Sequence, residues 1–192
     1  MGLLTTIRKQ KIKDKEIRVL ILGLDNSGKT TLVRHLLHED VSTVSPTLGF
    51  AIRTLSDIGG YTLQLWDVGG QSSLRPFWRN YFDRTDVVIW VVDATTVGEE
   101  RLSECRAELS KVVAEDKLSG AGVLVLVNKI DSVPSSVSID DIVKTVRVAL
   151  ALDRITNHEW IILPCSAYTG ENIDQGLRWA IDEVKRRLYR FD

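Results

Sequence analysis

The sequence predicts an α/β protein with a mainly parallel six-stranded sheet, one antiparallel edge strand and helices on both faces of the sheet. Short apolar, β-branched runs alternate with segments of helical period along the chain. An early pair of strand-like runs flanks a glycine-rich turn, which indicates a hairpin. A chain of 192 residues, 44% of them hydrophobic, is long enough to bury one substantial core.

The strands are predicted from runs that are too short for helices and rich in valine, isoleucine and leucine. The first run leads into a glycine-rich loop, and the second and third flank the turn at residues 56–60. Parallel strands of this kind are buried on both faces, so they lack a polar alternation. The expected strands are 17–22, 50–55, 61–67, 86–93, 122–127 and 160–165.

The helices are predicted from apolar side chains that recur on one face with a period of about 3.6 residues. One helical pattern begins directly after the glycine-rich loop, at residue 31, and the others cover 102–113, 139–150 and 173–188. Because helices that connect parallel strands cross over the sheet, they are expected to cover both of its faces.

Composition excludes several classes of protein. A net charge of -1 gives no global attraction to nucleic acid. Two cysteines, Cys105 and Cys165, argue against a disulfide framework and favour buried free thiols in a reducing compartment. No apolar run is long enough to span a bilayer, and the C-terminus lacks a prenylation motif. We therefore expect a cytoplasmic protein with no nucleic-acid partner.

Residues 23–30 have the sequence GLDNSGKT, which matches the phosphate-binding pattern GxxxxGK[ST] between a predicted strand and a predicted helix. Glycines let successive N–H groups converge on phosphate oxygens, and Lys29 is expected to reach the β- and γ-phosphates. The Thr30 hydroxyl is a candidate ligand for Mg²⁺. The alternative is a chance glycine-rich turn, and the loop alone does not separate ATP from GTP. Predicted nucleotide contacts here are Gly23, Asp25, Asn26, Ser27, Gly28, Lys29, Thr30 and Thr31.

A base-recognition site is predicted from the sequence NKID at 128–131, directly after a buried strand. The Asp131 carboxylate can accept from guanine N1–H and from the exocyclic amine, two donors that adenine does not present together. The stem of Lys129 can cover one face of the base, and Asn128 can tie this loop to the phosphate loop. Farther on, a backbone N–H near Ser166 or Ala167 can donate to guanine O6. The three loops together favour guanine, whereas each alone is compatible with an ordinary turn.

A hydrolysis site is predicted from the sequence DVGGQ at 67–71. Asp67 suits a magnesium site, the Gly70 N–H can face the γ-phosphate, and Gln71 can orient the attacking water. Upstream, Thr47 lies in a polar loop and can complete the Mg²⁺ shell while a γ-phosphate is present. Loss of that phosphate would release both loops. Read without the phosphate loop, the glycine pair is simply a turn that ends a strand.

These residues together resemble the small GTPases, and within them the Arf-like branch. The resemblance covers essentially the whole chain and rests on GLD at 23–25, WDVGGQ at 66–71, FWRNYF at 77–82 and CSAYTGEN at 165–172. Two positions depart from the branch, since Ile130 replaces the usual Gln and Ser27 replaces a common Ala. Neither change removes a group that touches nucleotide.

The resemblance implies a P-loop small-GTPase fold that cycles between GDP and GTP, with Mg²⁺ as cofactor and slow intrinsic hydrolysis. It implies a monomer that meets an exchange factor, a GTPase-activating protein and GTP-dependent effectors. It points to tubulin-folding cofactors, microtubules and carriers of lipidated proteins. It also places an exposed effector surface at Phe50, Trp66 and Tyr81, although these aromatic side chains are equally compatible with the core.

Two domains are expected: an N-terminal amphipathic helix and connector at 1–15, and a GTP-binding domain at 16–192. Leu3, Leu4 and Ile7 would lie on one side of a helix whose remainder carries Arg8, Lys9 and Lys11, as in helices that lie on anionic membranes. The start of the chain also fits the pattern for myristoylation at Gly2, and one acyl chain gives only weak membrane contact. The alternative is a short helix packed on the domain.

Two other functions fit the phosphate loop. A P-loop kinase for a small molecule or nucleotide would need an arginine-rich lid, which the sequence lacks, and it would leave residues 128–131 unexplained. A non-catalytic GTP-holding scaffold would leave Thr47 and Gln71 without a role. The prediction is therefore a regulatory GTPase.

Overall fold

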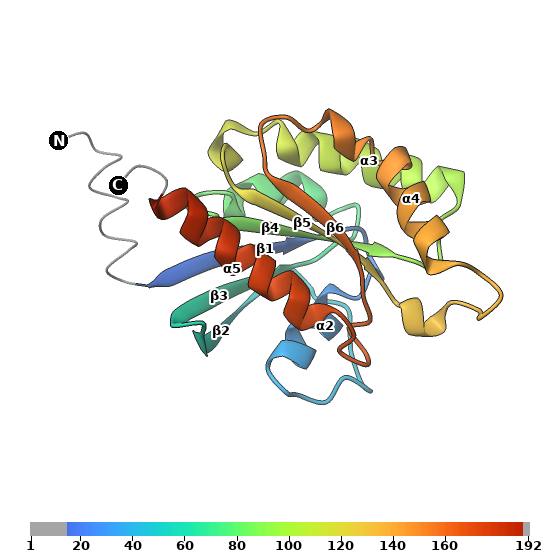
Figure 1. Cartoon of the computed structure of the whole chain (residues 1–192), viewed down its shortest axis with the longest axis horizontal. Helices are drawn as coiled ribbons and strands as arrows, with labels where there is room; N and C mark the ends of the chain where they lie inside the picture. Colours follow the sequence, from blue (N-terminus) through green and yellow to red (C-terminus); the bar gives the residue numbers. More distant parts are fainter. Residues whose placement is uncertain (1–14, 190–192) are drawn as a thin grey trace.

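The computed structural model describes residues 15–189 (Figure 1). Its centre is a six-stranded sheet with the order β2-β3-β1-β4-β5-β6. Every neighbouring pair is parallel except β2 and β3, which are antiparallel. The predicted fold class is therefore confirmed, with the antiparallel strand at the sheet edge.

The strands agree with the predicted runs to within a few residues. All five parallel strands end at the same edge of the sheet, so the loops that follow them gather there. The strands are β1 (Glu16–Leu22), β2 (Phe50–Ile58), β3 (Tyr61–Val68), β4 (Val87–Asp93), β5 (Gly122–Asn128) and β6 (Trp160–Pro164).

Within residues 15–189, three α-helices connect strands and a fourth follows the last strand, and together they cover both faces of the sheet. Helices α2 and α5 pack on one face, and α5 runs diagonally across it in Figure 1. Helices α3 and α4 pack on the opposite face. The helices are α2 (Lys29–Leu36), α3 (Glu99–Val113), α4 (Ile139–Ala149) and α5 (Ile173–Tyr189), with short 3-10 helices η1 (Arg75–Tyr81), η2 (Asp116–Leu118), η3 (Ile130–Ser132) and η4 (Leu152–Arg154).

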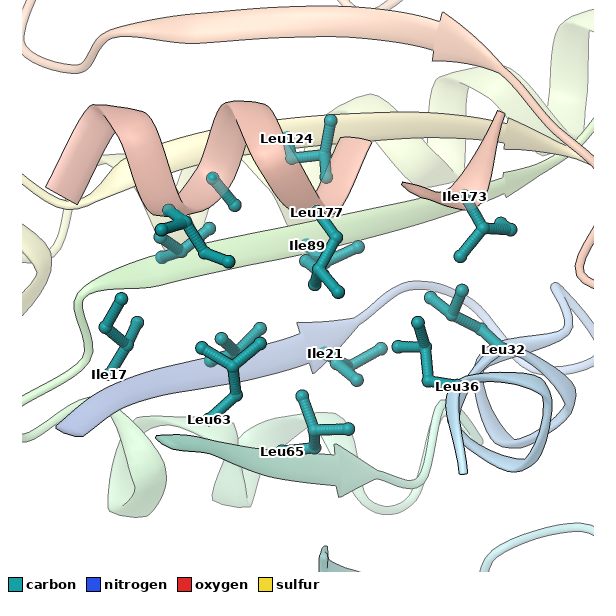
Figure 2. Close-up of a cluster of buried hydrophobic side chains, with 14 of the residues drawn as sticks. Ile17, Ile21, Leu32, Leu36, Leu63, Leu65, Ile89, Leu124, Ile173 and Leu177 are labelled. Carbon is teal, nitrogen blue, oxygen red and sulfur yellow. The ribbon is translucent and has the colours of Figure 1, made fainter. Parts of the chain in front are cut away.

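The core beneath α2 and α5 is formed by alternate residues of the central strands (Figure 2). Ile21 and Leu65 point from β1 and β3 toward Leu36 of α2, and Leu177 of α5 lies over Ile89 of β4. Burying such a side chain stabilises the fold by about 1.5–3 kcal/mol. This packing fixes the start of α2, and with it the phosphate loop.

The core on the other face uses the intervening strand residues. Trp90 of β4 is fully buried, and its ring meets Trp78 of η1 edge to face at a centroid distance of 5.8 Å. Cys105 of α3 lies in this layer and Cys165 in the other. Both are buried free thiols, as predicted, and burial raises the pKa of Cys105 to about 11 and that of Cys165 to about 12.

The hairpin between β2 and β3 differs from the expected turn. Residues 56–58 belong to β2, which carries a register shift between Leu55 and Ile58. The turn consists only of Gly59 and Gly60, with φ of 59° and 81°. Two successive positive φ angles suit a two-residue hairpin loop that matches the twist of the strands, so the glycines alone close the hairpin.

Several sequence predictions fall outside the described residues. They are the N-terminal amphipathic helix and myristoylation at Gly2. Within residues 15–189, no helix is both long enough and apolar enough to cross a membrane.

Candidate functional site

The phosphate loop joins β1 to α2 at the edge where the parallel strands end. Gly28 has a φ of 95°, and a Cβ built there would lie 2.3 Å from Asn128 Nδ2. Gly23 has a φ of 145°, and its Cβ would lie 2.3 Å from the Val91 carbonyl oxygen. The two glycines therefore allow the loop to pass directly against β4 and the end of β5.

Lys29 begins α2 and points back into the loop. Its Nζ donates to the Gly23 and Leu24 carbonyl oxygens at 3.0 and 2.8 Å. Burial lowers the pKa of Lys29 to about 8, against the opposing attraction of Asp67 and Asp25. The ammonium can instead donate to phosphate oxygens, whose negative charge would favour its charged form in this buried position.

The three predicted magnesium ligands lie together, although they come from three separate segments. Thr30 Oγ1 is 2.7 Å from both Thr47 Oγ1 and Asp67 Oδ2, and Thr47 Oγ1 donates to the same carboxylate oxygen at 3.1 Å. The other oxygen, Asp67 Oδ1, is buried without a hydrogen-bond partner among the described residues. Hydroxyl and carboxylate oxygens are the ligand types that Mg²⁺ prefers, so this donor set fits the ion.

This trio differs from metal sites that proteins build from their own side chains. Within residues 15–189, no group of three or more His, Cys, Asp or Glu side chains could hold a metal ion. A magnesium site here would therefore depend on ligands from a bound nucleotide and water, as is usual for this ion in phosphate-transfer sites.

A cleft of about 510 Å³ opens beside the trio. This volume is typical of a site for a small ligand. Gln71 lines the cleft, and its Oε1 is buried with no hydrogen-bond partner in the described part of the chain. Predicted site residues that line the cleft are Asp25, Asn26, Gly28, Lys29, Thr30, Thr31, Thr47, Gly70, Gln71 and Lys129.

Two glycines bring the loop after β3 into this cleft. A Cβ on Gly70 would lie 2.5 Å from both the Gly23 carbonyl oxygen and Lys29 Nζ. The Gly69 N–H donates to the Gly49 carbonyl oxygen at 2.8 Å, and a Cβ on Gly69 would lie 2.7 Å from the Thr47 carbonyl oxygen. The segment with Gln71 therefore contacts both the phosphate loop and the loop with Thr47.

The base side of the site is joined to the phosphate loop by direct hydrogen bonds. Asn128 is buried, its Nδ2 donates to the Ser27 carbonyl oxygen at 2.9 Å, and its Oδ1 accepts from the Ala167 N–H at 2.8 Å. Asp131 is exposed, and its Oδ1 accepts from Ser166 Oγ at 2.5 Å. The predicted base residues therefore lie in one place, and the tie through Asn128 is present.

The backbone N–H groups of Ser166 and Ala167, predicted to donate to guanine O6, already donate to oxygen atoms of the protein. The Ser166 N–H donates to the Glu171 carbonyl oxygen at 3.1 Å, and the Ala167 N–H is engaged by Asn128. A guanine O6 atom would have to share the Ala167 donor with Asn128. Donation from this loop to the base stays a prediction.

Asp93 is a site residue that sequence reasoning missed. Lys129 has a φ of 69°, and its Nζ bridges the Asn26 carbonyl oxygen at 2.6 Å and Asp93 Oδ2 at 2.7 Å. Thr95 Oγ1 holds the other Asp93 oxygen at 2.6 Å. Asp93 ends a buried strand at the ligand-binding edge of the sheet, and that position was the available signal.

The ionic contacts of Asp25, in the phosphate loop, were also not predicted from the sequence. Asp25 Oδ1 lies 3.2 Å from an Arg75 nitrogen and 3.3 Å from an Arg101 nitrogen. The arginines lie in η1 and α3, far from residue 25 in the chain. No motif links them to the loop.

The aromatic residues of the predicted effector surface form one cluster on the outer part of β2, β3 and η1. Phe50 is 48% exposed, and its ring stacks on Trp66 at 5.9 Å between centroids. Tyr81 lies 5.0 Å from Phe50 and 6.1 Å from Trp66. Arg18 covers the Trp66 ring at 3.7 Å. The cluster is partly exposed, so these side chains are not simply core.

Comparison with known proteins gives a consistent result. The sequence profile of the ADP-ribosylation factor family matches residues 3–184. ADP-ribosylation factor-like protein 2 of Arabidopsis thaliana and that of Drosophila melanogaster are each 45% identical to this chain over the whole length of both proteins. ADP-ribosylation factor-like protein alp41 of Schizosaccharomyces pombe is 46% identical, over 96% of this chain and 95% of the relative.

A solved structure supports the fold independently. The Arl6 BBS3 small GTPase from Trypanosoma brucei, solved with the nucleotide analogue GppNp, superposes with a TM-score of 0.74 and 24% sequence identity. The alignment covers 89% of this chain and 98% of that one.

Proposed function

The chain belongs to the ADP-ribosylation factor family of small GTPases, and from that premise we propose that it is a switch that binds GTP with Mg²⁺, hydrolyses it slowly and engages effectors while GTP is bound. The observation that carries the proposal is the meeting of Thr30, Thr47 and Asp67. This meeting gathers three oxygen donors from separate segments beside the phosphate loop, where a nucleotide-bound Mg²⁺ would use all three.

The roles of the residues follow from their positions. Lys29 would neutralise the β- and γ-phosphates, and Thr30, Thr47 and Asp67 would hold Mg²⁺, an ion that would stabilise the charge that develops on the phosphates. Asp131 accepts from the guanine edge while the stem of Lys129 covers the ring. The solved relative with GppNp supports a nucleoside triphosphate as the ligand of this fold.

Hydrolysis in this proposal uses water held by Gln71. The water oxygen forms a bond to the γ-phosphorus, the bond to the β–γ bridging oxygen breaks, and GDP leaves with that electron pair. The water proton ends on the released phosphate. Among residues 15–189, the side chains that line the cleft include no arginine, so a partner would have to supply one to speed the reaction. We therefore expect slow intrinsic turnover.

Loss of the γ-phosphate would remove the reason for Thr47 and Gln71 to face the cleft. The loop with Thr47 precedes β2, which carries Phe50 of the aromatic cluster. A change in this loop therefore reaches the surface that effectors would read. We propose cytoplasmic partners of the kinds that the family resemblance implies: a tubulin-folding cofactor linked to microtubules, and carriers of lipidated proteins.

The P-loop kinase alternative has less support. The family match and the base-side loop both favour guanine over adenine. No observation on the described residues favours a second small-molecule acceptor.

The test is Gln71→Leu, with Ser72→Ala in the same segment as the matched control. Single-turnover GTP hydrolysis should fall about 10²- to 10⁴-fold in Gln71→Leu, as expected for loss of one positioned catalytic side chain, while GTP affinity stays near the wild-type value. The GTP-loaded variant should also retain the proposed cofactor and carrier proteins that Thr30→Asn does not. Unchanged turnover would remove Gln71 from the mechanism, and equal retention by both variants would exclude a switch.

A further inference from the structure

Arg75 is a buried guanidinium that contacts three separate segments of the protein. Its side chain is 6% exposed. Nε donates to the Gly70 carbonyl oxygen at 2.8 Å, Nη1 to Glu104 Oε1 of α3 at 2.7 Å, and Nη2 to Asp25 Oδ1 at 3.2 Å. One side chain therefore joins the Gln71 segment to the phosphate loop and to α3.

A second arginine completes a balanced network of two cations and two carboxylates. Arg101 of α3 donates to Glu104 Oε2 at 2.9 Å and to the Asp25 carbonyl oxygen at 2.6 Å. The hydrogen bond from Arg75 is the main reason that the pKa of Glu104 lies below its usual value. Arg101 anchors the two acids without contacting the Gln71 segment, so that segment depends on Arg75 for its link to them.

The contact with the Gly70 carbonyl oxygen has a specific geometric consequence. A peptide group is planar, so fixing the Gly70 carbonyl fixes the direction of the Gln71 N–H and the start of the Gln71 residue. The preceding peptide is fixed separately, because Trp78 Nε1 donates to the Gly69 carbonyl oxygen at 2.9 Å. Trp78 is held in the core against Trp90. The two side chains from η1 thus orient successive peptides, and Arg75 orients the one that carries Gln71.

We propose that Arg75 is a positioning residue for Gln71, which holds the Gly70–Gln71 peptide against the phosphate loop and α3 when GTP is bound. This inference rests on the proposed function, because it concerns how the same segment is held for hydrolysis. In this proposal the side chains of Asp25, Glu104 and Arg101 form a fixed binding site for the Arg75 guanidinium, which we call the socket. When the segment leaves the γ-phosphate, Arg75 leaves the socket and Arg101 still pairs the two acids.

The test compares Arg75→Lys and Arg75→Ala with Arg79→Ala. Arg79 lies in the same 3-10 helix, but its side chain is 67% exposed and pairs with Glu115 at 3.0 Å. Lysine keeps the charge near the acids, but its three N–H donors share one nitrogen, so it cannot span the two acids and the Gly70 carbonyl oxygen as the three guanidinium nitrogens do. Both Arg75 variants should slow single-turnover hydrolysis about tenfold, the size expected for loss of a charged hydrogen bond, whereas Arg79→Ala should stay near the wild-type rate.

The second readout separates positioning from a general structural role. Dissociation of a non-hydrolysable GTP analogue should become faster by about tenfold relative to dissociation of GDP in the Arg75 variants. Glu104→Gln tests the same socket without removing the buried cation, and it should shift both quantities in the same direction by less. Should Arg75→Ala fail to fold, Arg75→Lys and Glu104→Gln carry the test.

The outcomes distinguish this inference from the proposed function. If the wild type hydrolyses no GTP, or if Gln71→Leu has no effect, the proposed function fails. If Gln71→Leu slows hydrolysis while the folded Arg75 variants retain the wild-type rate, the positioning role is overturned. Equal acceleration of GDP and GTP-analogue dissociation in the Arg75 variants would also overturn it, because that result describes a residue that only supports the fold.

Discussion

The base side and the phosphate side of the cleft are built on different principles. On the base side, Asn128 and Lys129 are held by atoms of the protein itself, through hydrogen bonds to Ser27, Ala167, Asn26 and Asp93. On the phosphate side, buried polar groups are left incompletely paired: Asp67 Oδ1 and Gln71 Oε1 have no partner among the described residues. Such groups are costly unless something else satisfies them. The base side is preformed, whereas the phosphate side leaves polar atoms that the proposed ligand would satisfy.

The largest effect is expected from Asp131, an exposed carboxylate on the base side. Asp131→Ala should lower GTP affinity about 10²- to 10⁴-fold, because two charge-assisted hydrogen bonds to guanine are lost. Its effect on the free energy of unfolding should be small, since the carboxylate is exposed and its partner Ser166 Oγ also accepts from the Thr169 N–H. Titration with fluorescent GTP measures the first and urea unfolding the second.

Asp182→Ala, an exposed carboxylate on α5, is the matched control for Asp131→Ala. It should leave both quantities unchanged. An affinity loss below about tenfold for Asp131→Ala, or equal competition by ATP and GTP in the wild type, would contradict recognition of guanine by Asp131.

An intermediate effect, on stability rather than affinity, is expected within the preformed side. Asn128→Ala leaves the Ser27 carbonyl oxygen and the Ala167 N–H unpaired in a buried place, so the nucleotide-free protein should lose about 2–4 kcal/mol of unfolding free energy. Thr47→Ala on the phosphate side should cost less than about 1 kcal/mol under the same conditions. Urea denaturation of the nucleotide-free proteins measures both.

Asn157→Ala serves as the control for the loss of an asparagine as such. Asn157 is exposed and donates one hydrogen bond, to the Val113 carbonyl oxygen at 2.9 Å. Its removal should cost about 0.5–1.5 kcal/mol at most. If Asn128→Ala and Thr47→Ala proved equally destabilising, the contrast between a preformed and a ligand-completed side would be lost.

Some parts of the molecule can be predicted from the sequence much better than others. Apolar, β-branched runs predict the strands, and a period of about 3.6 residues predicts the helices, because buried strands and amphipathic helices have distinct patterns. Their alternation along the chain predicts the sheet and the approximate bounds of its elements. The phosphate loop and the Asn128 tie were predictable because their residue types match the chemistry at fixed spacing. The role of Asp93 was less visible, because an aspartate at a strand end looks the same whether or not a lysine meets it.

The network around Arg75 lay beyond the sequence for a related reason. Arg75 and Glu104 are 29 positions apart, and Arg75 and Asp25 are 50 apart. Ion pairs between elements depend on how helix α3 packs on the sheet, which no local pattern specifies. The bulge in β2 was missed likewise, since the two glycines signal a turn but not where the preceding strand ends.

The smallest effect concerns the charge of Lys29 on the ligand-completed side. Its pKa is about 8 in the protein without ligand because burial disfavours the ammonium. Bound phosphates favour the ammonium and raise that pKa, so the complex holds more protons than the free protein above about pH 8. GTP affinity should therefore be constant below about pH 8 and should fall as the pH rises above it, by at most about tenfold per pH unit.

The control is Lys29→Arg, which keeps a charge that does not titrate in this range. Any titration of the guanine ring affects both proteins alike. The ratio of wild-type to Lys29→Arg affinity, measured by competition at constant salt and magnesium from about pH 7 to about pH 9, isolates the lysine. A ratio that does not change with pH would show that Lys29 is already fully charged before GTP arrives, and the phosphate side would then be as preformed as the base side.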